Sequence, residues 1–275
     1  MRRHLSRIRH WQGVAKSMAI NTVLSIPYMR KVVTRTHVTG IDGNEEQAQM
    51  LLQFFEGMAD IQNAVILELG PGKTLETLQF ARRRGAKYVI AADVTNYHTS
   101  QAAYRRGVDY RVFDGSHLPF PDNSVDVVWG CYCMQHFRDP QAMLQEIHRV
   151  LRPGGRLICR VDLRDHYHMF VIGRQYDCLR HSPRLWRWMA WNRSSYVNRL
   201  RLSEWKQLLA NSGFHTDALI PHEDVKLLEE NRSHGYLSHL DDQDLKTYRF
   251  DGSFQRALCL MLGVLANVEL FAEYL

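Results

Sequence analysis

A glycine-rich turn follows a short apolar segment in the first third of the chain. The stretch from Val65 to Thr74 reads VILELGPGKT. Its ending resembles the end of a phosphate-binding loop, in which glycines let backbone amides wrap around a phosphate. That loop requires a glycine five positions before Gly72, and this position is Leu67, inside the apolar segment. The turn is therefore not predicted to bind a nucleoside triphosphate.

The same turn also resembles the opening of a dinucleotide site. Gly70 and Gly72 match the first two glycines of G-x-G-x-x-G, but Leu75 stands where the third is needed. Asp93 ends the next apolar run, at a spacing that lets a carboxylate accept both ribose hydroxyls of a nucleoside. A turn that tolerates Leu75 and carries Glu68 suits a nucleoside cofactor without a pyrophosphate. S-Adenosylmethionine is such a cofactor.

Two short segments further along the chain carry candidate acid–base groups. His136 lies in MQHF, and the segment DLRDHYH holds Asp162, Asp165, His166 and His168. A side chain with a pKa near neutrality can remove the proton of a hydroxyl nucleophile. His136, Asp165 and His166 are the predicted catalytic candidates, and packing or an ordinary polar loop is the alternative. No metal site is predicted, because the cluster lacks an established ligand spacing.

Alternating strand and helix patterns position these residues. Apolar runs predict strands at residues 64–69, 88–93, 110–113, 125–129, 156–161, 214–220 and 245–250. Helical patterns lie at residues 44–58, 74–84, 139–151 and 203–211, with Asn44 and Asp139 as N-caps, and an apolar C-terminal helix is expected from Ser253. The alternation predicts an α/β fold with a doubly wound, mainly parallel sheet.

Composition is that of one large globular domain. The chain has 275 residues, of which 45% are hydrophobic and 11% aromatic. Its five cysteines are odd in number and form no CxxC pair, which favours reduced thiols in the cytoplasm over disulfides or a zinc site. No secretion signal is recognised, and no uncharged apolar run reaches the ~18–20 residues of a spanning helix.

Residues 1–43 form a predicted basic helical arm, and residues 44–275 the main domain. Residues 1–41 contain eight Lys/Arg and no acid, whereas the whole chain carries +6, so the remainder is net −2. The arm fits a transit peptide, a membrane-surface helix, a nucleic-acid arm or a solvated helix packed on the domain. The C-terminal helix fits a dimer face, a core element or a membrane-lying helix.

Residues 164–201 interrupt the alternation and are predicted to form a helical cap. This insertion is dense in arginine, tryptophan, tyrosine and histidine. Aromatic faces with arginines suit sugars, phosphorylated acceptors, an anionic lipid surface or single-stranded RNA. The alternative is an amphipathic helix with its arginines in water.

Three segments carry a resemblance to a known family. VILELGPGKT, VIAADV and FDGSHLPFPDNSVDVVWGCYCMQHFRDPQAMLQEIHRVLRPGGRLI resemble the class I S-adenosylmethionine-dependent methyltransferases. The likeness is to the small-molecule branch that includes ubiquinone-biosynthesis-like enzymes. It covers residues 60–162, with a fainter echo at LSEWKQLLANSGF. The resemblance implies a seven-stranded Rossmann-like sheet and S-adenosylmethionine as cofactor.

The resemblance also implies which residues bind the cofactor. They are Glu68, Gly70, Pro71, Gly72, Asp93, Val94, Asp114, Gly115, Ser116 and Cys131. The turn would lie under the methionine part, Asp93 would hold the ribose, and Val94 would contact the adenine. Residues 114–116 would meet the adenine amino group, and Cys131 would line the methionine end. Thr74 replaces a third glycine of many members and is expected to cap the following helix.

The resemblance and the histidines together predict a methyltransferase. The expected reaction is O-methylation by in-line displacement, with a histidine as the base. The expected acceptor is a small molecule or a glycan- or lipid-linked compound, and an anionic acceptor is among those expected. An RNA or protein methyltransferase is the alternative, although GCYC at residues 130–133 stands where amino-methylating enzymes carry an NPPY-type motif. A methyltransferase-like protein that binds the cofactor without catalysis is the third possible function. Nucleic acid is not the expected partner, and peripheral membrane contact and a homodimer are left open.

Overall fold

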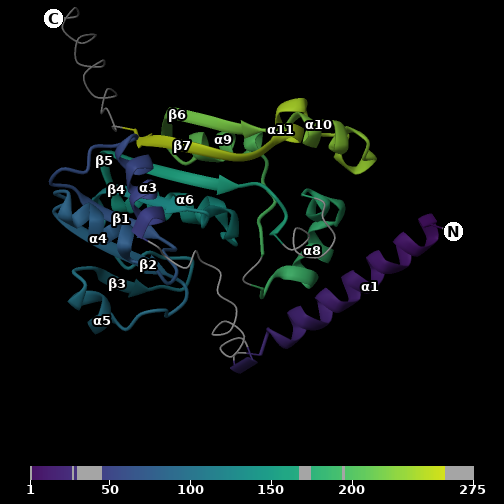
Figure 1. Ribbon diagram of the computed structural model, residues 1–275, viewed down its shortest axis with the longest axis horizontal. Coiled ribbons are helices and arrows are strands. Elements are labelled where there is room, and N and C mark those ends of the chain that lie inside the picture. The colour runs from purple at the N-terminus through teal and green to yellow at the C-terminus, as the bar shows by residue number, and fades with distance from the viewer. Residues whose placement is uncertain (1, 27, 30–44, 167–174, 194–195, 258–275) are drawn as a thin grey trace, which may run out of the picture.

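A seven-stranded sheet forms the centre of the computed structural model, which describes residues 2–26, 28–29, 45–166, 175–193 and 196–257 (Figure 1). The strands are β1 (Val65–Leu69), β2 (Tyr88–Asp93), β3 (Asp109–Val112), β4 (Val125–Cys131), β5 (Leu151–Asp162), β6 (Phe214–Glu223) and β7 (Thr247–Arg256). Their order is β3-β2-β1-β4-β5-β7-β6. Strands β1 to β5 pair in parallel, and β7 runs antiparallel between β5 and β6. The predicted α/β fold with a mainly parallel sheet is confirmed.

Helices cover both faces of the sheet. On one face, α3 (Glu45–Glu56), α4 (Glu76–Arg83) and α5 (Ser100–Arg105) pack on residues such as Ile66 and Trp129. On the other face, α6 (Pro140–Val150) and α9 (Leu202–Asn211) pack on residues such as Leu67 and Val128. Neighbouring strand residues thus face opposite layers, because side chains alternate along a strand. Both faces bury apolar residues, as expected for parallel strands.

The N-terminal helix α1 (Arg2–Val23) lies beside α8 (Pro183–Ala190) of the cap (Figure 1). Val14 of α1 is buried in one apolar cluster with Trp186 and Met189 of α8. Asn21 accepts a hydrogen bond of 2.7 Å from the backbone nitrogen of Asn192. One helix of the predicted arm, α1, therefore packs on one helix of the predicted cap, α8. Within the described ranges, no helix is both long and apolar enough to cross a bilayer.

The remaining elements are short. They are η1 (Met134–His136), η2 (Asp177–Arg180), α10 (Val225–Arg232), η3 (Gly235–Leu237) and α11 (Asp242–Lys246). Of these, η1 follows β4, η2 lies in the cap, and the other three lie between β6 and β7 in the chain. The helices α10 and α11 pack together at one end of that strand pair.

Two predictions about element ends were wrong. Ser253 does not begin a helix, because β7 continues to Arg256 and pairs with β5 and β6 on its two sides. Thr74 does not cap α4, whose N-cap position is Leu75 without a side-chain hydrogen bond. The expected C-terminal helix beyond residue 257 and the Asn44 cap lie outside the described residues. The Asp139 cap is confirmed by a 3.0 Å bond from the Ala142 nitrogen to Oδ1.

Candidate functional site

The turn after β1 depends on two glycines with left-handed backbone. Gly70 has φ +65° and Gly72 has φ +67°, a region that residues with a Cβ rarely adopt. A Cβ on Gly70 would also lie 2.8 Å from the Cβ of Cys133, which follows β4. The strand order reverses direction between β1 and β4, and ligands of such sheets bind at this switch point. The glycine turn is therefore held close against the segment after β4 at the expected binding crevice.

Asp93 connects this turn to the end of β2. Its side chain is buried, Oδ2 accepts a 3.1 Å bond from the Gly72 nitrogen, and Oδ1 accepts a 2.8 Å bond from the Thr95 nitrogen. Burial raises the pKa of Asp93, and these backbone bonds oppose the shift. Each carboxylate oxygen has a second lone pair. Asp93 can thus hold the turn and still accept hydrogen bonds from a pair of ribose hydroxyls.

Glu68 is a buried carboxyl group on β1, only 6% exposed. Its pKa is raised to about 8, chiefly by burial; the nearby Trp129 indole opposes the shift, and the charges of Glu76 and Asp93 contribute to it. Its Oε2 atom has no hydrogen-bond partner among the described residues. A buried acceptor without a partner is costly unless a ligand supplies a donor. The ammonium group of a methionine moiety is a donor of the required charge, so this side chain fits S-adenosylmethionine.

Two further predicted cofactor residues, Val94 and Gly115, lie together beyond β2 and β3. Val94 is 60% exposed, and a Cβ on Gly115 would lie 3.3 Å from its Cγ1 atom. The Oδ1 atom of Asp114 accepts bonds from the nitrogen and hydroxyl of Ser116 and from the His117 nitrogen, which lower the pKa of Asp114 to about 2. All three bonds use Oδ1. This exposed apolar surface with an ionised acceptor beside it suits an adenine ring and its amino group.

Cys131 ends β4 and is only partly buried. Burial raises the pKa of its thiol to about 12, and the nearest charges acting on it are those of Arg160 and Glu68. The thiol is therefore protonated at neutral pH and is a weak nucleophile. Its place between Glu68 and Arg160 agrees with a residue that lines a site, and its chemistry is not that of a reactive cysteine.

The predicted histidines meet, although they follow different strands. His136 ends η1, and its ring lies edge-on to the ring of His166 with centroids 5.1 Å apart. The Nε2 atom of His166 lies 3.5 Å from Oδ2 of Asp162, the last residue of β5. Parallel strands end at the same edge of a sheet, so the segments after β4 and β5 meet there.

His136 is a neutral base. Burial and, to a smaller extent, the charge of the neighbouring His166 lower its pKa to about 4. Its Nδ1 atom lies 2.5 Å from the Tyr196 carbonyl oxygen, which can only accept, so Nδ1 carries the proton. Nε2 consequently keeps its lone pair.

Asp162 supplies the negative charge beside these rings. Burial alone would raise its pKa, but hydrogen bonds from His166 and Arg164 bring the pKa below its ordinary value. Arg164 Nη2 lies 2.7 Å from Asp162 Oδ2. An ionised carboxylate can fix the orientation and the tautomer of His166.

Asp165, the third predicted catalytic residue, does not share this position. It is fully buried, and its backbone nitrogen donates a 2.7 Å bond to the Gln175 carbonyl. Its charge acts on the buried thiol of Cys178 in the cap. The two histidines come together at the strand ends, and Asp165 belongs to the interior of the cap.

A group of polar residues near Cys131 was not predicted. Its members come from β5, β6, β7 and the segment after β4, and they are Tyr132, Arg160, His222, Arg249 and Asp251. Arg160 interrupts an apolar strand pattern, which is a signal that the sequence does carry. Tyr132 has φ +55°, a conformation that is uncommon outside glycine.

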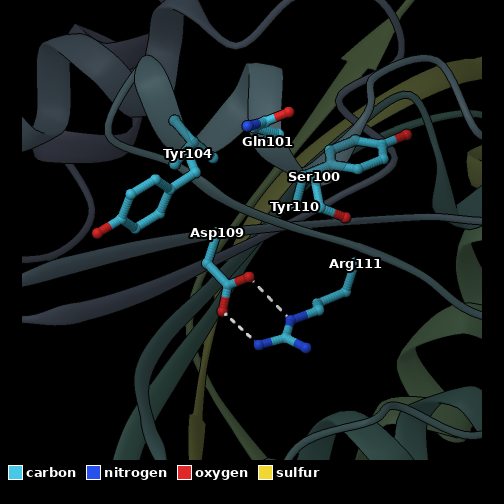
Figure 2. Close-up of a pocket in the computed structure, with 7 residues that line it drawn as sticks. Ser100, Gln101, Tyr104, Asp109, Tyr110 and Arg111 are labelled. Atoms are coloured by element: carbon cyan, nitrogen blue, oxygen red, sulfur yellow. Dashed lines mark hydrogen bonds and ion pairs between the residues drawn. The ribbon is translucent and has the colours of Figure 1, made fainter.

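The hollow drawn in Figure 2 lies elsewhere, between α5 and the edge strand β3. Its wall includes the ion pair between Arg111 and Asp109, with 2.8 Å from Nε to Oδ1. Tyr110 donates a 2.6 Å bond to the Thr95 carbonyl and so supports the loop after β2. None of the candidate catalytic residues lines this hollow.

The strand order, the glycine turn after β1 and the acid after β2 define a class I S-adenosylmethionine-dependent methyltransferase fold. Residues 67–159 match a family model described as a methyltransferase domain. The chain therefore carries a methyltransferase domain over these residues and has the fold of the class I S-adenosylmethionine-dependent methyltransferases, and it resembles the members that act on small molecules.

Known proteins show the same likeness. The ubiquinone/menaquinone biosynthesis C-methyltransferase UbiE of Vibrio cholerae is 35% identical over 101 residues, which are 34% of this chain and 39% of that protein. The methyltransferase GfsG of Streptomyces halstedii is 33% identical over 120 residues, which are 41% of this chain and 43% of that protein. The chain thus spans about two fifths of the length of these curated relatives.

Solved structures share the fold. A putative methyltransferase from Bacillus halodurans has a TM-score of 0.52 at 18% identity, covering 76% of this chain and 99% of that one. An S-adenosylmethionine-dependent methyltransferase from Mesorhizobium loti has a TM-score of 0.51 at 20% identity, covering 79% of this chain and 100% of that one.

Proposed function

We propose that the protein transfers the methyl group of S-adenosylmethionine to a small-molecule or glycan- or lipid-linked acceptor. The observation that carries this proposal is the meeting of two kinds of group at one edge of the sheet. The cofactor candidates Glu68 and Asp93 lie at the carboxyl ends of β1 and β2, as the penultimate and the last residue, and the His136–His166 pair follows β4 and β5. A methyl donor and a proton acceptor are the two components that methylation of a hydroxyl requires.

The cofactor-binding roles follow from the donors and acceptors present. Bound S-adenosylmethionine supplies a methyl group activated on a sulfonium sulfur. In this proposal Asp93 accepts the ribose hydroxyls, and Glu68 accepts from the methionine ammonium through its otherwise unpaired oxygen. Val94 and Gly115 contact the adenine, and Cys131 lines the methionine end.

His136 is the proposed base. Its lone pair is on Nε2, and it is neutral at physiological pH. It takes the proton of an acceptor hydroxyl as the oxygen is methylated. A positioned general base typically accelerates a reaction about 10²–10⁴-fold, and the lower end is expected for His136 because its pKa of about 4 lies below neutrality and makes it a weaker base. His166, oriented by Asp162, faces His136 and accepts or relays the same proton.

Methylation at carbon is a second candidate, because the UbiE relatives are described as C-methyltransferases. An acceptor ring activated for attack also loses a proton, so the same histidines would serve. The acceptor atom therefore needs a direct assignment.

An acceptor screen with S-adenosylmethionine labelled with ¹³C in the methyl group tests the proposal. Phenols, sugars, carboxylic acids, prenylated phenols and RNA are offered to the wild type and to His136→Gln. We expect labelled product from a small-molecule class, with its ¹³C shift separating a methyl on oxygen from one on carbon. Transfer to RNA alone, or an undiminished rate in His136→Gln, would contradict the proposal.

A further inference from the structure

The polar residues near Cys131 form one connected cluster, the Arg249 cluster, defined as Tyr132, Arg160, His222, Arg249 and Asp251. Arg160 on β5 pairs with Asp251 on β7, and Arg249 on β7 pairs with His222 on β6. Side chains of directly opposite residues lie on the same face of a sheet. The Arg160 guanidinium lies 4.3 Å from the ring centroid of Phe54, so this is the face that α3 covers.

Asp251 is the single acid of the cluster, and both of its carboxylate oxygens already accept hydrogen bonds from other members of the cluster. Arg160 donates to both of its oxygens, at 2.9 Å and 2.8 Å, in the two-pronged geometry that guanidinium and carboxylate prefer. His222 Nε2 lies 3.1 Å from Oδ2 of the same carboxylate. Arg160 therefore holds this carboxylate through two hydrogen bonds, and Arg249 shares it only through a longer contact of 3.6 Å to Oδ1.

Arg249 is the second arginine, and it has donors to spare. Its Nη1 donates to the Tyr132 hydroxyl at 3.2 Å, and its Nη2 lies 3.1 Å from the His222 ring nitrogens. Its Nε has no hydrogen-bond acceptor among the described residues and lies 3.6 Å from Oδ1 of Asp251. Asp162 lies opposite Arg249 on β5, but Arg164 already pairs with it. With two guanidinium groups and one carboxylate, the cluster itself therefore carries a net charge of +1 when His222 is neutral.

The cluster is accessible and is set in an otherwise apolar sheet. The side chain of Arg249 is 22% exposed and that of His222 is 29% exposed, whereas Asp251 is 6% exposed. A surplus positive charge in such a place attracts an anion, and arginine binds planar oxyanions through paired N–H groups.

The cluster also adjoins the proposed methyl-transfer site. Tyr132 follows Cys131 directly, and its nitrogen donates a 2.8 Å bond to the Arg160 carbonyl. The thiol of Cys131 is within reach of the charges of Arg160, Asp251 and Arg249 as well as Glu68. Tyr132 has left-handed backbone at φ +55°, and such conformations concentrate at functional sites.

We infer that the Arg249 cluster binds an oxyanion of the acceptor, a carboxylate or a phosphate, beside the methyl donor. Arg249 supplies the charge through the exposed part of its guanidinium, the Tyr132 hydroxyl adds a donor, and Arg160 with Asp251 holds the geometry. This inference rests on the proposed function and specifies its substrate class. The acceptor carries an acidic group and, within the same small molecule, the atom that is methylated.

Small probe anions test the inference by thermal unfolding in the presence of S-adenosylhomocysteine. Benzoate, its neutral counterpart benzamide and inorganic phosphate are each titrated onto the wild type, Arg249→Met, Arg249→Lys and Arg232→Met. Arg232 is a matched control because it pairs with Asp242 on the exposed α10–α11 region. We expect benzoate at about ten times its Kd to raise the wild-type midpoint by roughly 3–6 °C.

The expected pattern separates the cluster from general salt effects. Arg232→Met should respond as the wild type does, Arg249→Lys should bind about tenfold more weakly, and Arg249→Met and benzamide should show no shift. A larger shift with phosphate than with benzoate also supports the inference and assigns the oxyanion to a phosphorylated acceptor. Equal shifts for Arg249→Met and the wild type, or for benzamide and benzoate, overturn it.

The response to S-adenosylhomocysteine alone keeps the two proposals distinguishable. Every variant should be stabilised by this cofactor product, which also shows that Arg249→Met is folded. If the cofactor product stabilises none of the proteins, the proposed function fails. If it stabilises all of them and the probe anions act independently of Arg249, only this inference fails.

Discussion

His136 and His166 lie edge to face at 5.1 Å between ring centroids, one from the segment after β4 and one from the segment after β5. Asp162 stands behind His166, and the Tyr196 carbonyl fixes the proton of His136 on Nδ1. His136 therefore has an unprotonated Nε2, and the ring of His166 and the carboxylate of Asp162 lie next to it in turn. A lone pair on Nε2 is what a proton-accepting step requires.

Replacing His136 by glutamine should lower kcat about 10²–10⁴-fold for a hydroxyl acceptor. Cofactor affinity should change little, because His136 lies outside the proposed cofactor residues. Steady-state rates and calorimetry on the same preparation measure both quantities. A fall in cofactor affinity as large as the fall in kcat would mean that the residue is structural.

The pH dependence of kcat/KM gives an independent check on the base. The active form is unprotonated, and burial with the neighbouring His166 brings the pKa of His136 to about 4. Activity should therefore persist as pH falls and decline only near pH 4. An acid limb near the ordinary histidine value of about 6.5 would contradict His136 as the base.

Glu68 should make the protein without cofactor less stable as pH rises. Its pKa is about 8 in the folded protein against 4.5 for an ordinary glutamate, so the folded state holds its proton more tightly. This contribution to stability is complete below pH 4.5 and is lost as pH rises through about 8. Glu68→Gln should gain stability relative to the wild type over that range in denaturant titrations. Glu229→Gln, at an exposed site on α10, should show no such trend.

Binding of S-adenosylmethionine at pH 7 should release up to about one proton from Glu68. The ammonium group of the cofactor favours the ionised carboxylate, and Glu68 is largely protonated before binding. Calorimetry in two buffers of different ionisation enthalpy counts the released proton. The Glu68→Gln variant should release none, and an equal release by both proteins would remove Glu68 from the cofactor site.

Gly70→Ala should destabilise the fold more than Gly107→Ala. Both glycines have left-handed backbone, at φ +65° and +77°, so both variants carry backbone strain of about 1 kcal/mol or more. Only Gly70 adds a clash, with the Cβ of Cys133 at 2.8 Å, whereas nothing lies within 4 Å at Gly107. Denaturant midpoints measure the difference, and the second change Cys133→Gly should recover part of it. Equal losses in the two single variants would show that the turn is not held against this segment.

Much of the fold could be predicted from the sequence because parallel strands buried on both faces leave short apolar runs. The β2 prediction matches the strand, and the end of β7 does not. The sequence pattern predicts a helix that begins at Ser253. In the structure, hydrogen bonding of β7 to β5 on one side and to β6 on the other outweighs that local preference. Which strands become neighbours is decided by the whole sheet.

The candidate site also has one part that the sequence predicts and another that only the folded structure reveals. Gly70, Asp93, His136 and His166 could be selected because their residue types and spacing carry chemistry. The contact between the two histidines depends on how the segments after β4 and β5 fold. The Arg249 cluster could not be found because it requires β7 to lie between β5 and β6, and sequence order alone does not indicate this.

The most direct test of the account is calorimetric binding of S-adenosylmethionine to the wild type and to Asp93→Ala. Asp139→Ala is the control, since it removes a helix N-cap away from the cofactor residues. Loss of a charge-assisted ribose contact should cost roughly 1.5–3 kcal/mol, or about 10–150-fold in Kd, with the control unchanged. Equal affinity in wild type and Asp93→Ala, or no binding by the folded wild type, would contradict a cofactor site at this turn.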